Sequence, residues 1–199
     1  DKCAEIGLSP VSGKSYFQTV ALREATIDEA ASQIRVIGPG VDTAFLHHEE
    51  IIADALHPYP SGLLIATKGG IVRPAQERWD RDGRPTHLRA ACEASLRRLR
   101  VERIDLYQLH AIDPDVRLEE SLGELARLQQ AGKIRHIGVS NFTGAELARA
   151  RRVVKVVSVQ NRCNVADRSS DGVLAACERD GIAFIPWSPL ARSPREPSE

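Results

Sequence analysis

Short apolar runs alternate with helix-like segments from residue 41 to residue 190, and this alternation is the strongest constraint on the fold. The runs are almost continuous in apolar residues, as in strands that are buried on both faces. The segments between them repeat apolar residues every three or four positions, which indicates amphipathic helices. Strands that alternate with helices predict an α/β fold of right-handed βαβ units around a parallel sheet. The six expected strands are "VDTA", "GLLIATK", "RIDLYQLH", "KIRHIGVSN", "VVSVQN" and "IAFIPWSPL".

Several helix ends can also be predicted. Thr86 is expected to cap the helix "THLRAACEASLRRLR", because a threonine hydroxyl can accept from a free backbone N–H of the first turn. Gly132 and Gly181 are expected to end the helices that precede them. Glu49 and Glu50 are expected in the first turn of the helix after "VDTA", where the positive end of the helix dipole favours acidic groups.

The first 40 residues carry a weaker pattern. Residues 26–37, "TIDEAASQIRVI", are expected to form a helix capped by Thr26, and residues 15–22 a strand. We expect a single domain over residues 1–191, of which 1–40 is a divergent part. Residues 192–199 are polar and proline-rich and are expected to form a frayed tail.

Composition limits the class of protein. The chain has 199 residues, of which 42% are hydrophobic, so a packed domain is expected. Its formal net charge is +0, from 27 basic and 27 acidic residues, which argues against nucleic acid or an anionic membrane surface as a partner. No apolar run approaches the roughly 18 residues of a membrane span. The four cysteines include no C-x-x-C pair, so reduced thiols in a cytoplasmic protein are expected.

Two parallel architectures fit the alternation: a doubly wound open sheet and a (β/α)₈ barrel. An open dinucleotide-binding sheet would carry a glycine-rich phosphate loop after its first strand, whereas "GPG" at 38–40 precedes a strand. A barrel demands functional side chains at the C-terminal ends of several strands. Polar or aromatic residues stand there in succession: Asp42, Lys68, His110, Ser140 with Asn141, Gln160 with Asn161, and Trp187 with Ser188. The sequence therefore favours a (β/α)₈ barrel with a site at its mouth.

These residue types indicate a definite chemistry. A lysine beside a carboxylate, here Lys68 and Asp42, forms an ion pair that biases the proton affinity of a neighbouring group. The imidazole of His110 can hydrogen-bond a carbonyl or pass a proton. The amides of Asn141 and Gln160 and the Ser140 hydroxyl are partners that a carboxamide ligand needs, and Trp187 offers a flat face to a flat ring. Together they describe a site for an aromatic carboxamide next to a polarised carbonyl.

The strand-end motifs resemble, in order and spacing, those of the aldo-keto reductase family. The resemblance covers roughly residues 41–191 and, through "HPYP" at 57–60, is closest to bacterial-type reductases. It implies a (β/α)₈ barrel that reduces aldehydes or ketones to alcohols with NADPH as cofactor and without a metal. The matching stretches are "VDTA", "LLIATKGG", "IDLYQLH", "GKIRHIGVSNF", "VVSVQNRCNV" and "FIPWSPLA".

The resemblance also implies roles for single residues. Asp42 and Lys68 would form the ion pair that tunes the general acid, and His110 would orient the substrate carbonyl. The NADPH contacts would come from Ser140, Asn141 and Gln160 to the carboxamide, from Trp187 to the nicotinamide ring, and from Ser188, Pro189 and Leu190 along the pyrophosphate.

The sequence also departs from the family pattern. After Asp42 the family places a Tyr-Gly pair whose tyrosine is the general acid, whereas this chain reads "FLHHEE". About six βα units are recognisable, and the first and eighth strands are not. Cys163 stands where relatives often carry an aromatic residue.

Three hypotheses remain open. The first is an NADPH-dependent oxidoreductase of impaired activity. The second is a nucleotide-binding or partner-binding barrel without catalysis, or a truncated product, whose open barrel edges would favour self-association. The third is a metal-dependent hydrolase that uses His47, His48 and Glu50, although adjacent histidines diverge and rarely share one ion.

Overall fold

The computed structural model describes residues 24–28, 33–38, 41–45, 48–75 and 78–189. Contacts within the chain divide it into two compact units, Asp1–His48 and Glu49–Glu199. The strand expected at residues 15–22 and the tail at 192–199 lie outside the described residues. A single domain over residues 1–191 therefore stays a prediction.

The first unit contains a three-stranded antiparallel sheet of β1 (Glu24–Asp28), β2 (Gln33–Gly38) and β3 (Val41–Phe45). The helix predicted for residues 26–37 is therefore wrong. This stretch is rich in β-branched residues, which are restricted in a helix and suit a pleated strand.

The "VDTA" run does form a strand, β3, but it pairs antiparallel with β2 and does not join a parallel sheet. Ile34 stands opposite Phe45, and Gly38 opposite Val41. Only two residues separate β2 from β3 in the sequence. So short a connection suits a hairpin, whereas parallel strands need a crossover of a dozen or more residues.

The second unit is built on a parallel sheet. Its strands lie in the order β10-β9-β8-β7-β4, and every neighbouring pair is parallel. Strands that follow one another in space as in the chain match a barrel, because a doubly wound sheet reverses its order part-way. The strands are β4 (Ala66–Gly69), β7 (Ile104–Leu109), β8 (Ile134–Ser140), β9 (Val156–Arg162) and β10 (Ala183–Trp187). The predicted α/β fold of βαβ units is confirmed.

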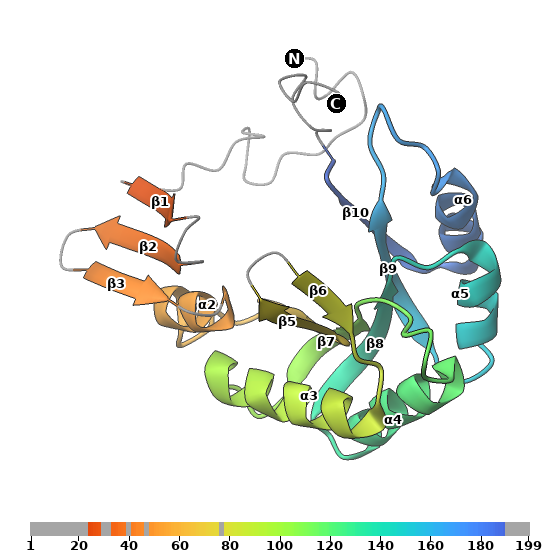
Figure 1. The fold of residues 1–199 in the computed structure, drawn as a ribbon, viewed down its shortest axis with the longest axis horizontal. Helices are drawn as coiled ribbons and strands as arrows, with labels where there is room; N and C mark the ends of the chain where they lie inside the picture. The colour runs from red at the N-terminus through yellow and green to blue at the C-terminus, as the bar shows by residue number, and fades with distance from the viewer. Residues whose placement is uncertain (1–23, 29–32, 39–40, 46–47, 76–77, 190–199) are drawn as a thin grey trace. The chain divides into compact units, whose positions relative to one another are not determined.

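Four helices connect these strands and lie in one layer outside the curved sheet (Figure 1). They are α3 (Pro85–Leu99), α4 (Leu118–Gln130), α5 (Gly144–Ala150) and α6 (Asp171–Asp180). A further helix, α2 (His48–Leu56), precedes β4 and has Glu49 and Glu50 in its first turn, as predicted.

The helix ends agree with the sequence in two of three cases. Gly132, with φ +74°, follows the C-cap of α4, and Gly181, with φ +66°, is the C-cap of α6. Thr86 is not the N-cap of α3, because the helix begins at Pro85 and its N-cap is Arg84. Proline suits the first helical position, since its fixed φ is helical and its missing N–H has no partner there.

A short hairpin between β4 and α3 was not predicted. It consists of β5 (Ile71–Ala75) and β6 (Arg78–Arg81). The guanidinium of Arg81 donates to the carbonyl of Ile112 at 3.1 Å, and the backbone N–H of Gly83 donates to the carboxylate of Asp113 at 2.8 Å. These bonds tie the hairpin to the segment that follows His110.

The parallel sheet has one face against the helices. Tyr107, Leu109, Ile137, Val139 and Val159 are at most 1% exposed and belong to one hydrophobic core with the apolar sides of the helices. Side chains alternate along a strand, so the residues between these positions face the other side of the sheet. That second face receives the polar strand-end residues.

Three further features of the described residues concern thiols, membrane spans and metal ligands. Cys92, Cys163 and Cys177 are free thiols, and burial raises the pKa of Cys92 to about 11, so its reactive thiolate form is disfavoured. None of the described helices is long and apolar enough to cross a bilayer. Within the same residues, no three His, Cys, Asp or Glu side chains are grouped so as to hold a metal ion.

Candidate functional site

Strand register brings four of the predicted site residues to one face of the parallel sheet. Lys68 stands opposite Gln108 on β7, and Ser140 stands opposite Gln160 on β9. His110 follows Gln108 by two positions, and its backbone N–H donates to the carbonyl of Gly69 at 2.9 Å, which continues the ladder. All four candidates therefore lie at the C-terminal ends of neighbouring strands, on the face away from the helices.

Burial acts on both basic groups of this face, and Lys68 also acts on His110. Burial lowers the pKa of the Lys68 ammonium below its usual range. Burial also lowers the pKa of the His110 imidazole, and the positive charge of Lys68 lowers it further. His110 is therefore neutral at pH 7, a form in which one ring nitrogen donates and the other accepts.

The lowered pKa of His110 predicts a pH-dependent stability. Between this pKa and about 6.5, the unfolded chain binds a proton that the folded chain does not. The free energy of unfolding should therefore fall as the pH falls through this window and level off below the folded-state pKa. Urea unfolding across the window should show a steeper slope for the wild type than for His110→Gln. The exposed His136 offers the control His136→Gln; equal slopes for both variants would contradict the assignment.

Asn141 is the centre of a hydrogen-bond network at the end of β8. Its amide nitrogen donates to the carbonyl of His110 at 3.0 Å and to the hydroxyl of Ser140 at 3.2 Å. Its amide oxygen accepts from the indole nitrogen of Trp187 at 3.0 Å. Its backbone has φ +60°, a left-handed conformation that asparagine tolerates better than most residues. Asn141 thus joins the ends of β7, β8 and β10.

Asn161 fixes the segment that carries Asn141. The backbone N–H of Phe142 donates to its amide oxygen at 3.0 Å, and its amide nitrogen donates to the carbonyl of Phe142 at 2.7 Å. Asn161 is only 5% exposed, so both bonds lie away from solvent. The sequence marked it as a strand-end residue but gave no sign of this supporting role.

Asn161→Asp should loosen the end of β8. The aspartate keeps the shape of the side chain but loses the N–H donor and places a charge beside the carbonyl of Phe142. Leaving a buried polar group unsatisfied costs about 1–3 kcal/mol, and more where a charge is involved. Chemical denaturation should show a loss in this range, and amide exchange at residues 140–142 should accelerate. Asn161→Asp with unchanged stability would contradict the inferred role.

Trp187 and Ser188 end β10. The Trp187 ring is 38% exposed, and the guanidinium of Arg162 lies over it, 5.6 Å from the ring centre. Ser188 has φ +54°, a strained conformation of the kind that clusters at functional sites, and its carbonyl accepts from the amide of Asn164 at 3.0 Å. Pro189 is exposed, and Leu190 lies outside the described residues. Asn164 was missed in the sequence; it is 6% exposed.

The expected ion pair between Asp42 and Lys68 stays a prediction. Asp42 lies on β3 of the first unit, opposite Ile37, and its side chain is not among those that the structure describes. The same holds for the side chains of His48 and Glu50, and His47 lies outside the described residues altogether.

Neither Tyr59 nor Tyr107, the two tyrosines among the described residues, places its hydroxyl on this face. The Tyr59 hydroxyl donates to the carbonyl of Leu99, at the end of α3, at 2.8 Å. Tyr107 is fully buried on the helix-covered face, and its hydroxyl has no hydrogen-bond partner among the described residues. The third tyrosine, Tyr16, lies outside the described residues.

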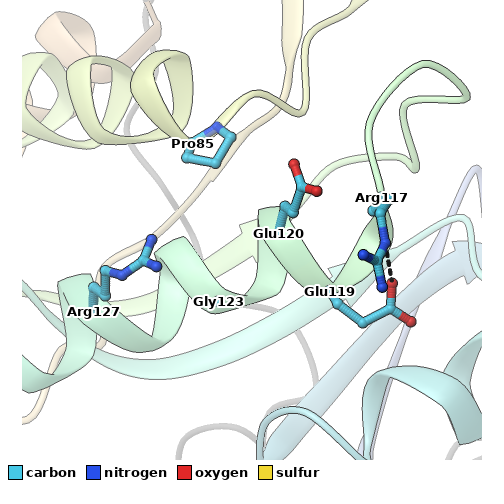
Figure 2. Close-up of a pocket in the computed structure, with 6 residues that line it drawn as sticks. All are labelled: Pro85, Arg117, Glu119, Glu120, Gly123 and Arg127. Carbon is cyan, nitrogen blue, oxygen red and sulfur yellow. Dashed lines mark ion pairs between the residues drawn. The ribbon is translucent and has the colours of Figure 1, made fainter.

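A separate groove lies in the helical layer (Figure 2). It encloses about 250 Å³, and Arg117 and Glu119 form an ion pair of 4.0 Å at its side. None of the candidate site residues lines it. The lining comes from the first turn of α3 and from α4 with its N-cap: Pro85, Arg117, Glu119, Glu120, Gly123 and Arg127.

The order of the strands and the residues at their ends have a counterpart in a known family. Residues 41–196 match the model of the Aldo/keto reductase family. The chain belongs to this family. The resemblance inferred from the strand-end motifs is thereby confirmed.

Two curated proteins illustrate the similarity. "Uncharacterized oxidoreductase C215.11c" of Schizosaccharomyces pombe is 47% identical over 143 residues, which are 72% of this chain and 46% of that protein. "Pyridoxine 4-dehydrogenase" of Escherichia coli is 37% identical over 147 residues, 71% of this chain and 51% of that protein. The chain thus spans about half the length of the curated relatives that it matches.

Solved structures of aldo/keto reductases share the fold. The glycerol dehydrogenase of Gluconobacter oxydans has a TM-score of 0.69 at 33% identity, covering 77% of this chain and 50% of that one. An aldo/keto reductase of Klebsiella pneumoniae, solved in complex with NADP and acetate, has a TM-score of 0.62 at 26% identity, covering 74% and 50%. The βα units of this chain therefore correspond to half of an aldo/keto reductase barrel.

Proposed function

We propose that the protein reduces aldehydes or ketones to alcohols with NADPH. The observation that carries this proposal is the gathering of Lys68, His110, Ser140 and Gln160 on one face of the parallel sheet, at the C-terminal strand ends. Membership of the aldo/keto reductase family supports the reaction class, and a relative that holds NADP supports the cofactor. The substrate is a small molecule with a carbonyl group.

The side chains of this face suit the reaction. The neutral His110 imidazole would donate a hydrogen bond to the substrate carbonyl oxygen and so orient it. The Lys68 ammonium would give a proton to that oxygen, since a lowered pKa makes it a stronger acid than an ordinary lysine. Solvent would then return a proton to Lys68.

The residues at the ends of β8, β9 and β10 fit the nicotinamide end of NADPH in part. When bound, the cofactor supplies a hydride to the carbonyl carbon. Among the described residues, the half-buried side-chain amide of Gln160 has no hydrogen-bond partner, so it is free to pair with a carboxamide. Trp187 would offer the ring face that Arg162 leaves open. The polar atoms of Asn141 are bonded to neighbours, so Asn141 would have to exchange partners.

A steady-state assay that follows the absorbance of NADPH with a reactive aldehyde tests the proposal. We expect aldehyde-dependent loss of NADPH in proportion to protein. The rate should lie about 10²- to 10⁴-fold below that of family members that carry the tyrosine, which is the usual contribution of a positioned general acid. Turnover at background, with NADPH binding intact by fluorescence titration, would end the claim of catalysis.

A second candidate function is a nucleotide-binding barrel without catalysis. The observation that favours it is the placement of Tyr59 and Tyr107, whose hydroxyls lie away from the site face. A ligand that binds only the folded chain raises its stability, by about 2.7 kcal/mol at a hundred times Kd. We expect NADPH to raise the Tm under both functions, and an unchanged Tm would contradict both.

A further inference from the structure

The carboxylate of Glu49 gathers donors from two other elements. Its oxygen Oε1 accepts from the hydroxyl of Thr67 on β4 at 2.5 Å and from the hydroxyl of Ser95 on α3 at 2.7 Å. Its oxygen Oε2 accepts from the guanidinium of Arg98 on α3 at 2.6 Å. The Glu49 side chain is only 14% exposed, so these charge-assisted bonds lie largely out of water. An ordinary first-turn glutamate would instead face solvent.

One of these donors stands next to Lys68. Thr67 and Lys68 are neighbours on β4, so their side chains lie on opposite faces of the sheet. The bond from Thr67 to Glu49 therefore holds the strand from the helix side while Lys68 projects from the site side. Rotation of Thr67 about the strand axis would turn Lys68 with it.

Within the described sheet, β4 is bonded to a neighbouring strand along one edge only. It has four residues, and within the described sheet it is an edge strand whose one partner is β7. Its ends are tied by backbone bonds, from Asp105 and Leu106 to the carbonyl of Ile65 at 3.1 Å and from His110 to the carbonyl of Gly69 at 2.9 Å. The ladder with β7 runs through the middle of the strand, with Thr67 opposite Tyr107 and Lys68 opposite Gln108, but it holds β4 along one edge only, so the bond from Thr67 to Glu49 adds a second point of attachment.

We propose that Glu49 is a positioning residue that fixes the orientation of the Lys68 side chain through the hydroxyl of Thr67. The link to Ser95 and Arg98 anchors the carboxylate to α3, and the link to Thr67 transmits this anchor to the strand. The contribution of this arrangement to catalysis rests on the function proposed above. The orientation of the Lys68 side chain can be measured without turnover.

The test compares variants that cut single links. Thr67→Val removes the link to β4 and keeps the shape and branching of the side chain, and Thr67→Ser restores the hydroxyl. Ser95→Ala is the matched control, because it removes one bond to the same carboxylate oxygen from α3. Glu49→Gln keeps a hydrogen-bonding oxygen but removes the charge. Urea unfolding measures the stability of each variant, so that a loss of stability can be told from a change in the orientation of Lys68.

The readout is the ammonium of Lys68. The chain has five lysines, so reductive ¹³C-methylation gives few signals, and Lys68→Arg identifies the one from Lys68. We expect Thr67→Val and Glu49→Gln to move this signal and to raise its titration midpoint toward the ordinary value of a lysine ammonium. Thr67→Ser and Ser95→Ala should leave both in place. Equal shifts in Thr67→Val and Ser95→Ala, or no shift in Thr67→Val, would overturn the proposal.

Turnover provides the second readout. If the protein reduces carbonyls, Thr67→Val should lower kcat by about 10- to 100-fold with little change in KM, because a misplacement of about 1 Å has a cost of that order. Thr67→Ser should recover most of the loss. A wild type without turnover removes the proposed function alone, since the Lys68 signal still decides whether Glu49 positions this side chain.

Discussion

Lys68→Met is expected to lower NADPH-dependent carbonyl reduction by about 10²- to 10⁴-fold, because it removes the proposed proton donor and leaves the rest of the face in place. The stability of the fold should not decrease. Burial lowers the pKa of Lys68, so the folded protein holds this ammonium against a desolvation cost that methionine does not have. The Tm of Lys68→Met at neutral pH should equal or exceed that of the wild type.

The same variant makes a prediction for His110. The positive charge of Lys68 contributes to the lowered pKa of His110, so Lys68→Met should raise that pKa toward its ordinary value. NMR titration of the imidazole measures this directly. Lys133→Met, which breaks an ion pair with Glu93 on the helical side, is the control and should alter neither turnover nor the titration. Turnover by Lys68→Met at the wild-type rate would exclude Lys68 as the acid.

Gly69→Ala is expected to destabilise the fold by about 1–3 kcal/mol, the usual cost of forcing extra volume into a packed core. A Cβ at Gly69 would overlap the hydroxyl oxygen of Tyr107 and lie 2.9 Å from its ring carbon Cζ. Tyr107 is fully buried and packed between the sheet and the helices, so the ring has little room to retreat. Chemical denaturation with a constant m-value should record the loss.

Tyr107→Phe tests the cause of this loss. The Tyr107 hydroxyl has no partner among the described residues, so its removal should be near neutral or stabilising. In the Tyr107→Phe background, Gly69→Ala should cost less, because the overlapping oxygen is gone. The rescue should be partial, since the ring carbon Cε1 would still lie 3.1 Å from the new Cβ. Strictly additive effects of the two substitutions would refute the steric explanation.

The parallel sheet could be predicted from the sequence because its strands are buried. Strands such as β7 and β9 read as near-continuous apolar runs, and the helices between them have regular apolar spacing. The strand-end residues followed from this register, since polar side chains after buried strands must meet at one edge. Lys68, His110 and Gln160 are expected at this edge for that reason, whereas their roles stay predictions.

The features that the sequence did not predict have physical causes. The sequence predicts a helix over residues 26–37, but the β-branched residues Ile27, Ile34 and Ile37 lie in the strands β1 and β2. The β5–β6 hairpin carries Pro74 and no alternation, so no local signal marks it. The roles of Glu49 and Asn161 rest on partners 18 to 49 residues away, and a single sequence does not show which distant groups will meet.

The bond from the Trp187 indole to Asn141 sets a condition on any ligand of that carboxamide. A ligand that takes the place of the indole at the Asn141 amide oxygen exchanges one hydrogen bond for another and gains little enthalpy from the new one. Selectivity would then come from the ring that stacks on Trp187 rather than from the polar group. A carboxamide without a ring should therefore bind weakly.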